Sequence, residues 1–115
     1  MASIRIISAN QRVARQLQQA LDSAGYPAET FAPGAEGVRP AAGQASLLLL
    51  HVEDLSDEAG GLLIGQRVPI VALFGAPSPG AVTGALDLGA EDALTMPVSV
   101  PELVARIRAI LRRRS

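Results

Sequence analysis

Residues 47–52 have the sequence Leu-Leu-Leu-Leu-His-Val, and residues 69–74 have the sequence Pro-Ile-Val-Ala-Leu-Phe. Both runs are almost wholly apolar and lack the polar alternation of a strand with one wet face, so they predict strands buried on both faces of a parallel sheet. Shorter strands are predicted at residues 3–7, 28–32 and 92–95, where runs of strand-forming residues end at turn residues.

The segment that follows the first strand has a helical period. In residues 10–24 apolar side chains recur at helical spacing, among them Val13, Leu17 and Leu21. Asn10 is placed to cap this helix, and Gly25 is placed to end it. Residues 33–45 and 55–67 are rich in glycine, alanine or proline and carry only weak helical patterns.

Two further helices are predicted in the second half of the chain. The first begins at a Ser78 cap, with Pro79 in its first turn, and stops at Gly89. The second opens with the capping-box spacing of Ser99 and Glu102 and carries a continuous apolar face. Strands and helical patterns thus alternate along the chain, which predicts one α/β domain over residues 1–115, with a parallel sheet covered by helices on both faces.

Composition excludes several classes of function. The chain has 115 residues, no cysteine and one histidine, so disulfides, thiolate chemistry and multi-histidine zinc sites are absent. All ten basic residues are arginine, and the net charge is −1, which gives no overall field for nucleic acid. The longest aliphatic run is too short to span a membrane, so we expect a cytoplasmic protein without membrane partners.

The order of these motifs resembles the receiver domain of bacterial response regulators over essentially the whole chain. The most specific piece is Gly-Ala-Glu-Asp-Ala-Leu-Thr-Met-Pro at residues 89–97, followed by Pro-Glu-Leu-Val-Ala-Arg-Ile-Arg at 101–108. This closing segment is similar to the OmpR/PhoB group of transcription factors. The resemblance implies a flavodoxin-like (βα)5 fold with strand order 2-1-3-4-5 and a site at the carboxyl ends of the strands.

The residues that carry the family's phosphorylation chemistry are replaced here. The resemblance implies two Mg²⁺-binding carboxylates after the first strand, a phosphoacceptor aspartate ending the third, a hydroxyl ending the fourth and a lysine after the fifth. The matching positions hold Ser8, Ala9, His51, Phe74 and Met96. Serine and alanine are poor ligands for Mg²⁺, and phosphoryl transfer without a metal or lysine loses its electrostatic support.

We therefore expect a degenerate receiver that is not phosphorylated, uses no metal or other cofactor, and is not an enzyme. His51 fills the abandoned pocket as a strand-end histidine, although phosphorylation at its ring is a formal alternative. Phe74 and Met96 suggest an apolar plug, or else ordinary core. Glu53 and Asp54 are the acids nearest to His51 in the sequence, and they could bind a stray cation or simply be solvated.

Two other motifs give only weak indications of function. Residues 75–80 follow a strand and open a helix as a phosphate loop does, but the lysine and hydroxyl residue of that motif are missing. The run Arg112-Arg113-Arg114 ends the last helix, where cations are favoured by the helix dipole. In the family such a run marks the exit toward a winged-helix effector domain, which we expect to lie outside this chain and to make any contact with DNA.

The resemblance also implies a homodimer through the fourth helix, the fifth strand and the fifth helix. OmpR/PhoB-type receivers form three charge pairs between subunits there. This chain keeps two of them by position. In the third pair Glu102 remains, but Val82 stands at the position of its basic partner. Apolar surface between the pairs would provide the affinity. The residues expected at this interface are Val82, Leu86, Asp87, Asp92, Ala93, Glu102, Arg106 and Arg108.

The two pairs kept by position are Asp87 with Arg108 and Asp92 with Arg106, each formed between subunits. Glu102 and Arg106 are four residues apart on one helix, so they can pair with each other instead. Three functions follow as hypotheses: a phosphorylation-independent dimerisation and regulatory module of a transcription regulator, a stand-alone adaptor for other proteins, and a small-molecule sensor that uses the vacated pocket.

Overall fold

The computed structural model describes residues 2–33, 45–53, 67–76 and 80–114. Its elements are β1 (Ile4–Ser8), α1 (Gln11–Ser23), β2 (Ala28–Phe31), β3 (Leu47–Val52), β4 (Ile70–Phe74), α4 (Ala81–Leu88), β5 (Asp92–Thr95) and α5 (Val100–Arg114). Each predicted strand is confirmed to within about one residue at either end. The weak helical patterns at 33–45 and 55–67 lie outside the described residues, apart from their end residues.

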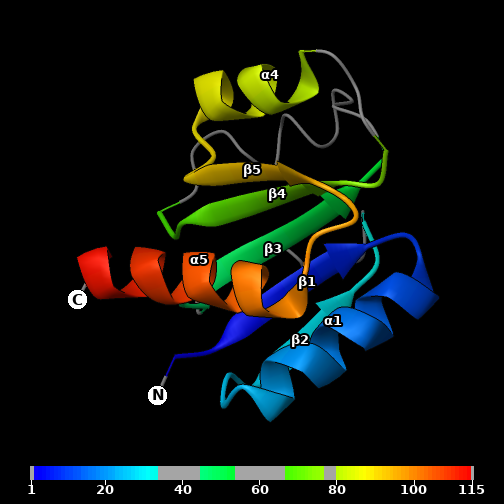
Figure 1. The fold of residues 1–115 in the computed structure, drawn as a ribbon, viewed down its shortest axis with the longest axis vertical. Coiled ribbons are helices and arrows are strands. Elements are labelled where there is room, and N and C mark those ends of the chain that lie inside the picture. The colour runs from blue at the N-terminus through cyan, green and yellow to red at the C-terminus, as the bar shows by residue number, and fades with distance from the viewer. Residues whose placement is uncertain (1, 34–44, 54–66, 77–79, 115) are drawn as a thin grey trace.

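The strands form one parallel sheet in the order β2-β1-β3-β4-β5, which is the predicted order (Figure 1). In the register between β1 and β3, Ile4 lies opposite Leu47 and Ser8 lies opposite His51. The register between β3 and β4 places His51 opposite Leu73. The carboxyl ends of the central strands therefore meet at one edge of the sheet.

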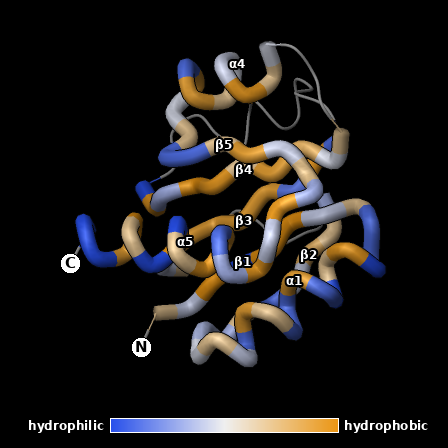
Figure 2. The backbone as a smooth tube through the Cα atoms, viewed as in Figure 1, coloured by the Kyte–Doolittle hydropathy of each residue, from blue (hydrophilic) through white to orange (hydrophobic). Residues whose placement is uncertain are grey.

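The core lies in two layers, one on each face of the sheet. Alternate residues of each strand point to opposite faces, so Leu47 and Leu49 join the layer under α1 and α5, whereas Leu48 and Leu50 join the layer under α4. Figure 2 shows the central strands as nearly unbroken hydrophobic segments. Helices on both faces, as predicted, are what allow these strands to be apolar on both sides.

Local signals set most of the helix ends. The side chain of Asn10 accepts a hydrogen bond from the backbone N–H of Val13 at 3.1 Å, which confirms the predicted cap of α1. Gly25 follows this helix with a φ of +90°, a conformation that glycine adopts without strain. At α5 the Ser99 hydroxyl accepts from the backbone N–H of Glu102 at 3.2 Å, as a capping box requires.

The predicted start of α4 is wrong. The cap of this helix is Gly80, with a φ of +84° and no side-chain capping bond, rather than Ser78. A residue in the left-handed conformation cannot sit inside a helical turn, so the helix begins after it at Ala81. Ser78 and Pro79 lie outside the described residues. Within the described ranges, no helix has the length and apolarity needed to cross a bilayer.

Candidate functional site

Ser8 and His51 meet at the carboxyl edge of the sheet. Their strands are neighbours in register, and the Ser8 Oγ lies 2.8 Å from the His51 Nδ1. Each residue is only 4% exposed. These are the positions at which the resemblance implies a metal-binding carboxylate and the phosphoacceptor, and in this chain they form a buried hydrogen bond with each other.

The Ser8 hydroxyl also fixes the start of α1. It accepts a hydrogen bond from the backbone N–H of Asn10 at 3.0 Å, and it lies 3.2 Å from the carbonyl oxygen of the same residue. One hydroxyl thus links β1, the His51 ring and the turn that leads into the helix. A carboxylate at position 8 would lose the donor capacity of this hydroxyl.

The charge state of His51 follows from its burial. Desolvation lowers the pKa of the imidazole below its ordinary value of 6.5, and the nearby carboxylate of Glu53 opposes this shift as the smaller effect. The ring is therefore neutral at pH 7. A neutral ring can accept the Ser8 hydroxyl proton at Nδ1, which leaves the proton of the ring on Nε2.

Phe74 and Met96 do not form one apolar plug. Phe74 is fully buried in the core layer under α4, whereas Met96 packs against the layer under α1 and α5. The Met96 backbone N–H bonds the carbonyl of Phe74 at 2.7 Å, so the two residues are neighbours in the backbone but diverge in their side chains. For Phe74 the interpretation as ordinary core is the one that the structure supports.

The hollow beside His51 contains fewer of the expected residues than the sequence suggested. It has a volume of about 500 Å³ and is lined by Ala9, Asn10, Gln11, His51, Val52 and Glu53. Of the five positions expected to form a vacated pocket, only Ala9 and His51 line it. The described residues hold no group of three or more potential metal-ligating side chains, and Asp54 lies outside them.

Glu53 sits against the predicted phosphate loop. A Cβ built on Gly75 would lie 2.7 Å from the Cδ of Glu53, so the carboxylate lies directly over this glycine. A negative charge here opposes the binding of a phosphate by the same loop. Residues 77–79 of the loop lie outside the described residues.

A second candidate surface is formed by α4, β5 and α5, and Arg106 is its central charged group. Within the chain this guanidinium donates to Asp92 at 3.0 Å and to Glu102 at 3.2 Å. The expected alternative, that Glu102 and Arg106 pair along one helix, is thus confirmed. Arg106 also joins α5 to β5, so the Asp92–Arg106 pair that the resemblance implies between subunits forms here within one chain.

The remaining residues of this surface differ in their availability to a partner. Leu86 is 45% exposed, Asp87 and Arg108 are exposed, and Val82 is half-buried. Ala93 is only 8% exposed and belongs to the core under α4, so it offers little contact area. Among the residues expected at the interface, the exposed apolar area therefore lies on α4.

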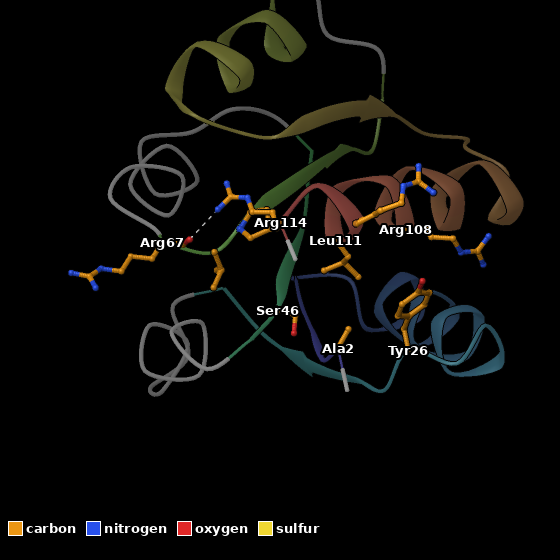
Figure 3. Close-up of a pocket in the computed structure, with 10 residues that line it drawn as sticks. Ala2, Tyr26, Ser46, Arg67, Arg108, Leu111 and Arg114 are labelled. Carbon is orange, nitrogen blue, oxygen red and sulfur yellow. Dashed lines mark hydrogen bonds between the residues drawn. The ribbon is translucent and has the colours of Figure 1, made fainter.

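A further hollow lies at the opposite edge of the sheet, where the amino ends of the strands meet the end of α5 (Figure 3). Tyr26, Arg108, Leu111 and Arg112 are among the residues that line it. Neither Tyr26 nor this grouping of side chains was expected from the sequence. The available signal was the spacing of Arg108, Leu111 and Arg112, which share one side of α5.

The strand order and the helices on both faces define a flavodoxin-like α/β domain, and comparisons with known proteins point to receiver domains within that class. The chain is 39% identical over 118 residues to the uncharacterized transcriptional regulatory protein YkoG of Bacillus subtilis, covering 95% of this chain and 50% of that protein. It is 36% identical over 120 residues to the transcriptional regulatory protein PcoR of Escherichia coli, covering 98% and 53%. The chain spans about half the length of the curated relatives that it matches.

Solved structures give the same fold. A two-component response regulator from Clostridium difficile superimposes with a TM-score of 0.84 at 24% identity, over 100% of this chain and 99% of that one. The receiver domain of the Francisella response regulator 1452 gives a TM-score of 0.85 at 16% identity, over 100% of both chains. No protein-family model matches the chain. The chain thus has the fold of response-regulator receiver domains over its whole length, and its sequence relatives are transcriptional regulators of the OmpR/PhoB type.

Proposed function

We propose that this chain is a phosphorylation-independent receiver, which acts by binding rather than catalysis as the dimerisation and regulatory module of a transcription regulator. The observation that carries the proposal is the buried hydrogen bond of 2.8 Å between Ser8 and His51. This hydrogen bond lies at the positions where an active receiver needs carboxylates. Contact with DNA would be made by an effector domain outside this chain.

Electrostatics supports the loss of phosphorylation. Mg²⁺ prefers charged oxygen ligands, and a serine hydroxyl that is already engaged with His51 and Asn10 is a weak substitute. The chain has no lysine to neutralise the incoming phosphoryl oxygens, and Met96 stands where the resemblance implies one. The Glu53 carboxylate beside Gly75 adds repulsion against an anion.

Intact-protein mass spectrometry tests this half of the proposal. The chain is incubated with Mg²⁺ and either acetyl phosphate or phosphoramidate, beside a receiver that carries the usual aspartates as the positive control. We expect the control to gain the mass of one phosphoryl group and this chain to keep its own mass. A stable phosphoryl adduct on this chain, lost in a His51→Asn variant, would overturn the proposal.

The dimer half of the proposal rests on the surface of α4, β5 and α5. Leu86 is 45% exposed, and Asp87 and Arg108 are exposed charges of opposite sign on different elements of this surface. In a two-fold dimer each such pair can form twice, because the same patch is used by both subunits. Val82 replaces a cation of the family pattern and makes the centre of this patch more apolar.

Arg106 determines how the charge pairs would change on assembly. Because it is already paired with Asp92 and Glu102 within the chain, a pair across the interface would exchange one partner for another. Such an exchange sets the orientation of the subunits and adds little affinity. The affinity would therefore depend on Leu86 and Val82.

Sedimentation velocity tests the dimer. We expect a dimer for the wild type, a monomer for Leu86→Glu, and weakened dimers for Arg106→Glu and Asp92→Arg, with Arg12→Glu on the distant α1 as the matched charge control. The combined Arg106→Glu and Asp92→Arg variant should regain part of the dimer. If the wild type sediments as a monomer, or Leu86→Glu leaves a wild-type dimer, this surface is not the interface.

In the hypothesis of a stand-alone adaptor, the surface of α4, β5 and α5 binds a different protein instead of a second copy of this chain. The length of the full open reading frame separates the two hypotheses, because a winged-helix sequence after Ser115 is required only by the transcription regulator. The sensor hypothesis has less support, because Ser8, Phe74 and Met96 do not line the hollow beside His51.

A further inference from the structure

A third hollow lies between α1 and β2, the strand at one edge of the sheet (Figure 1). It has a volume of about 410 Å³, within the range of about 300–1,000 Å³ that is usual for small-molecule sites. None of the residues that line it belongs to the surface of α4, β5 and α5. A function of this hollow is therefore separate from the proposed dimer.

The outer edge of β2 is partly covered by side chains of α1. The N–H of Ile4 donates to the carbonyl of Pro27 at 3.0 Å, so alternate residues of this strand turn their backbone groups toward β1 and those between them turn outward. Ala28 turns outward, and its N–H donates to the Asp22 carboxylate at 3.2 Å. Its carbonyl accepts from the side chain of Gln18 at 2.9 Å. These two side chains take the place of a neighbouring strand at Ala28.

Thr30 is the next outward residue of β2, and it lines the hollow. No hydrogen bond from another described residue reaches its outward N–H or carbonyl. Because the backbone groups of Ala28 are already occupied, a whole strand cannot add to this edge. The donor and the acceptor of Thr30 instead match one secondary amide, which carries the complementary pair of groups.

Arg15 is the cation of this hollow. It lines the hollow together with Gln11 and Gln18, since spacings of four and three residues place these side chains on one face of α1. The Arg15 side chain is exposed, and it has no ion pair or hydrogen bond with any residue that the structure describes. No carboxylate is among the described residues that line the hollow.

The acids of α1 and β2 do not compensate for this cation. Asp22 is bonded to the backbone of β2, and Glu29 pairs with Arg5 on the other face of the sheet. α1 has no acid in its first turn, and Arg12 and Arg15 both lie in the half of the helix nearest the positive end of its dipole. An anion in the hollow would relieve this unfavourable arrangement.

The composition of the lining selects a carboxylate among anions. One guanidinium donates two parallel hydrogen bonds to one carboxylate, and no second described cation lines the hollow to balance the further charge of a phosphate. Three alanines, Ala9, Ala14 and Ala32, add a small apolar area. The hollow thus combines one cation, one backbone donor and acceptor, and room for an aliphatic group.

We propose that this hollow binds a small N-acylated amino acid with an aliphatic side chain. Arg15 contacts the carboxylate, the backbone of Thr30 contacts the amide, and the alanines contact the side chain. The inference goes beyond the proposed function and does not depend on it, because neither phosphorylation nor dimerisation enters the recognition.

Titrations followed by ¹⁵N NMR separate the three contributions. The probes are N-acetylvaline, N-acetylvalinamide, which lacks the charge, isovalerate, which lacks the amide, and methyl phosphate. We expect N-acetylvaline to bind at least tenfold more tightly than each of the others and to shift the amide signals of Gln18, Thr30 and Ala32. Equal affinity for N-acetylvaline and any other probe, tighter binding of methyl phosphate, or shifts confined to other residues would overturn the proposal.

A matched pair of arginine variants tests the charge. Arg15→Gln should weaken the binding of N-acetylvaline at least fivefold and leave that of N-acetylvalinamide unchanged. Arg12→Gln removes the same charge from the same helix at a position that does not line the hollow, so it should bind as the wild type does. An equal loss in both variants would reduce the effect to general electrostatics and refute the site.

The backbone contact is tested at Thr30. Thr30→Pro removes the outward N–H without removing a hydrogen bond of the sheet, as an edge strand permits. It should weaken N-acetylvaline at least fivefold and leave isovalerate unchanged, whereas Thr30→Val, which keeps the N–H, should bind as the wild type does. Unchanged binding in Thr30→Pro, or an equal loss in Thr30→Val, would refute the amide contact. If Thr30→Pro does not fold, the pair of Arg15 and Arg12 variants decides.

Two further arms exclude other assignments. Ala9 and Gln11 line both this hollow and the one beside His51, but His51 itself lines only the latter. His51→Asn should therefore bind N-acetylvaline as the wild type does, and a loss would assign the binding to the other hollow. An acetylated tetrapeptide that ends in valine should bind no more tightly than N-acetylvaline, and a tenfold gain would identify a peptide terminus as the ligand and overturn the inference.

Discussion

The substitution His51→Asn should remove a pH dependence of stability that the wild type has. Asparagine places its Oδ1 near the position of the His51 Nδ1, so it can still accept from the Ser8 hydroxyl. It cannot be protonated in the range where histidine titrates. Because the chain has one histidine, the difference between the two proteins isolates this group.

The direction follows from the lowered pKa of His51, whose main cause is burial. Between the folded pKa and the ordinary value of 6.5, the unfolded chain binds a proton that the folded chain does not. The free energy of unfolding is therefore fully maintained above pH 6.5 and falls as the pH decreases toward the folded pKa. The slope for one group is at most about 1.4 kcal/mol per pH unit.

The hydrogen bond to Ser8 does not cancel this effect. A protonated ring would donate from Nδ1, and the Ser8 Oγ could accept that bond while it donates to the Asn10 carbonyl 3.2 Å away. The bond survives in either state, so the cost of burying the charged ring decides the sign.

Urea unfolding at a series of pH values from 5 to 8 measures the effect. We expect the wild type to lose stability relative to His51→Asn as the pH falls from about 6.5. We expect His51→Ala to be less stable than His51→Asn at every pH, by about 1–3 kcal/mol, because alanine loses the buried hydrogen bond to Ser8 and leaves a cavity. Identical pH profiles for the wild type and His51→Asn, or a wild type that gains stability on acidification, would refute the reasoning.

Three other substitutions test the fold by the same unfolding assay. Asn10→Ala should lose about 1 kcal/mol, because the Val13 N–H loses its acceptor, and an unchanged midpoint would argue against the cap. Gly80→Ala should lose about 1–2 kcal/mol through backbone strain at a φ of +84°, since a new Cβ would meet nothing within 4 Å; a stability gain would contradict this account. Ile107→Ala, at a fully buried position on α5, should lose about 2–5 kcal/mol, and a loss below 1 kcal/mol would show that the core under α5 is less well packed than described.

Much of the fold could be predicted because its signals are local. The apolar runs of β3 and β4 predict buried parallel strands whatever lies around them, and Asn10 and Ser99 cap helices by reaching backbone groups three residues away. The start of α4 was missed because a glycine in the left-handed conformation carries no side-chain signal, whereas the Ser-Pro pair at 78–79 has the sequence pattern of a helix start.

The functional surfaces were predictable only in part. The sequence by itself led to the prediction that the acidic and lysine positions of a receiver are replaced, because that prediction depends only on residue identity at the positions that the resemblance matches. Only the tertiary structure decided that Ser8 and His51, which are 43 residues apart, share a hydrogen bond, and that Phe74 and Met96 pack in different layers. Strand register and the alternation of side chains across the sheet set these contacts.

The same distinction holds for the charged residues of α5. Their spacing along the helix determined that Arg106 could reach Glu102, whereas only the structure placed the Asp92–Arg106 pair within one chain. The hollow beside Arg108 and Arg112 exists because α5 lies across the amino ends of strands from distant parts of the sequence. Contacts within one helix follow from its fixed geometry, whereas contacts between elements depend on how the whole core packs.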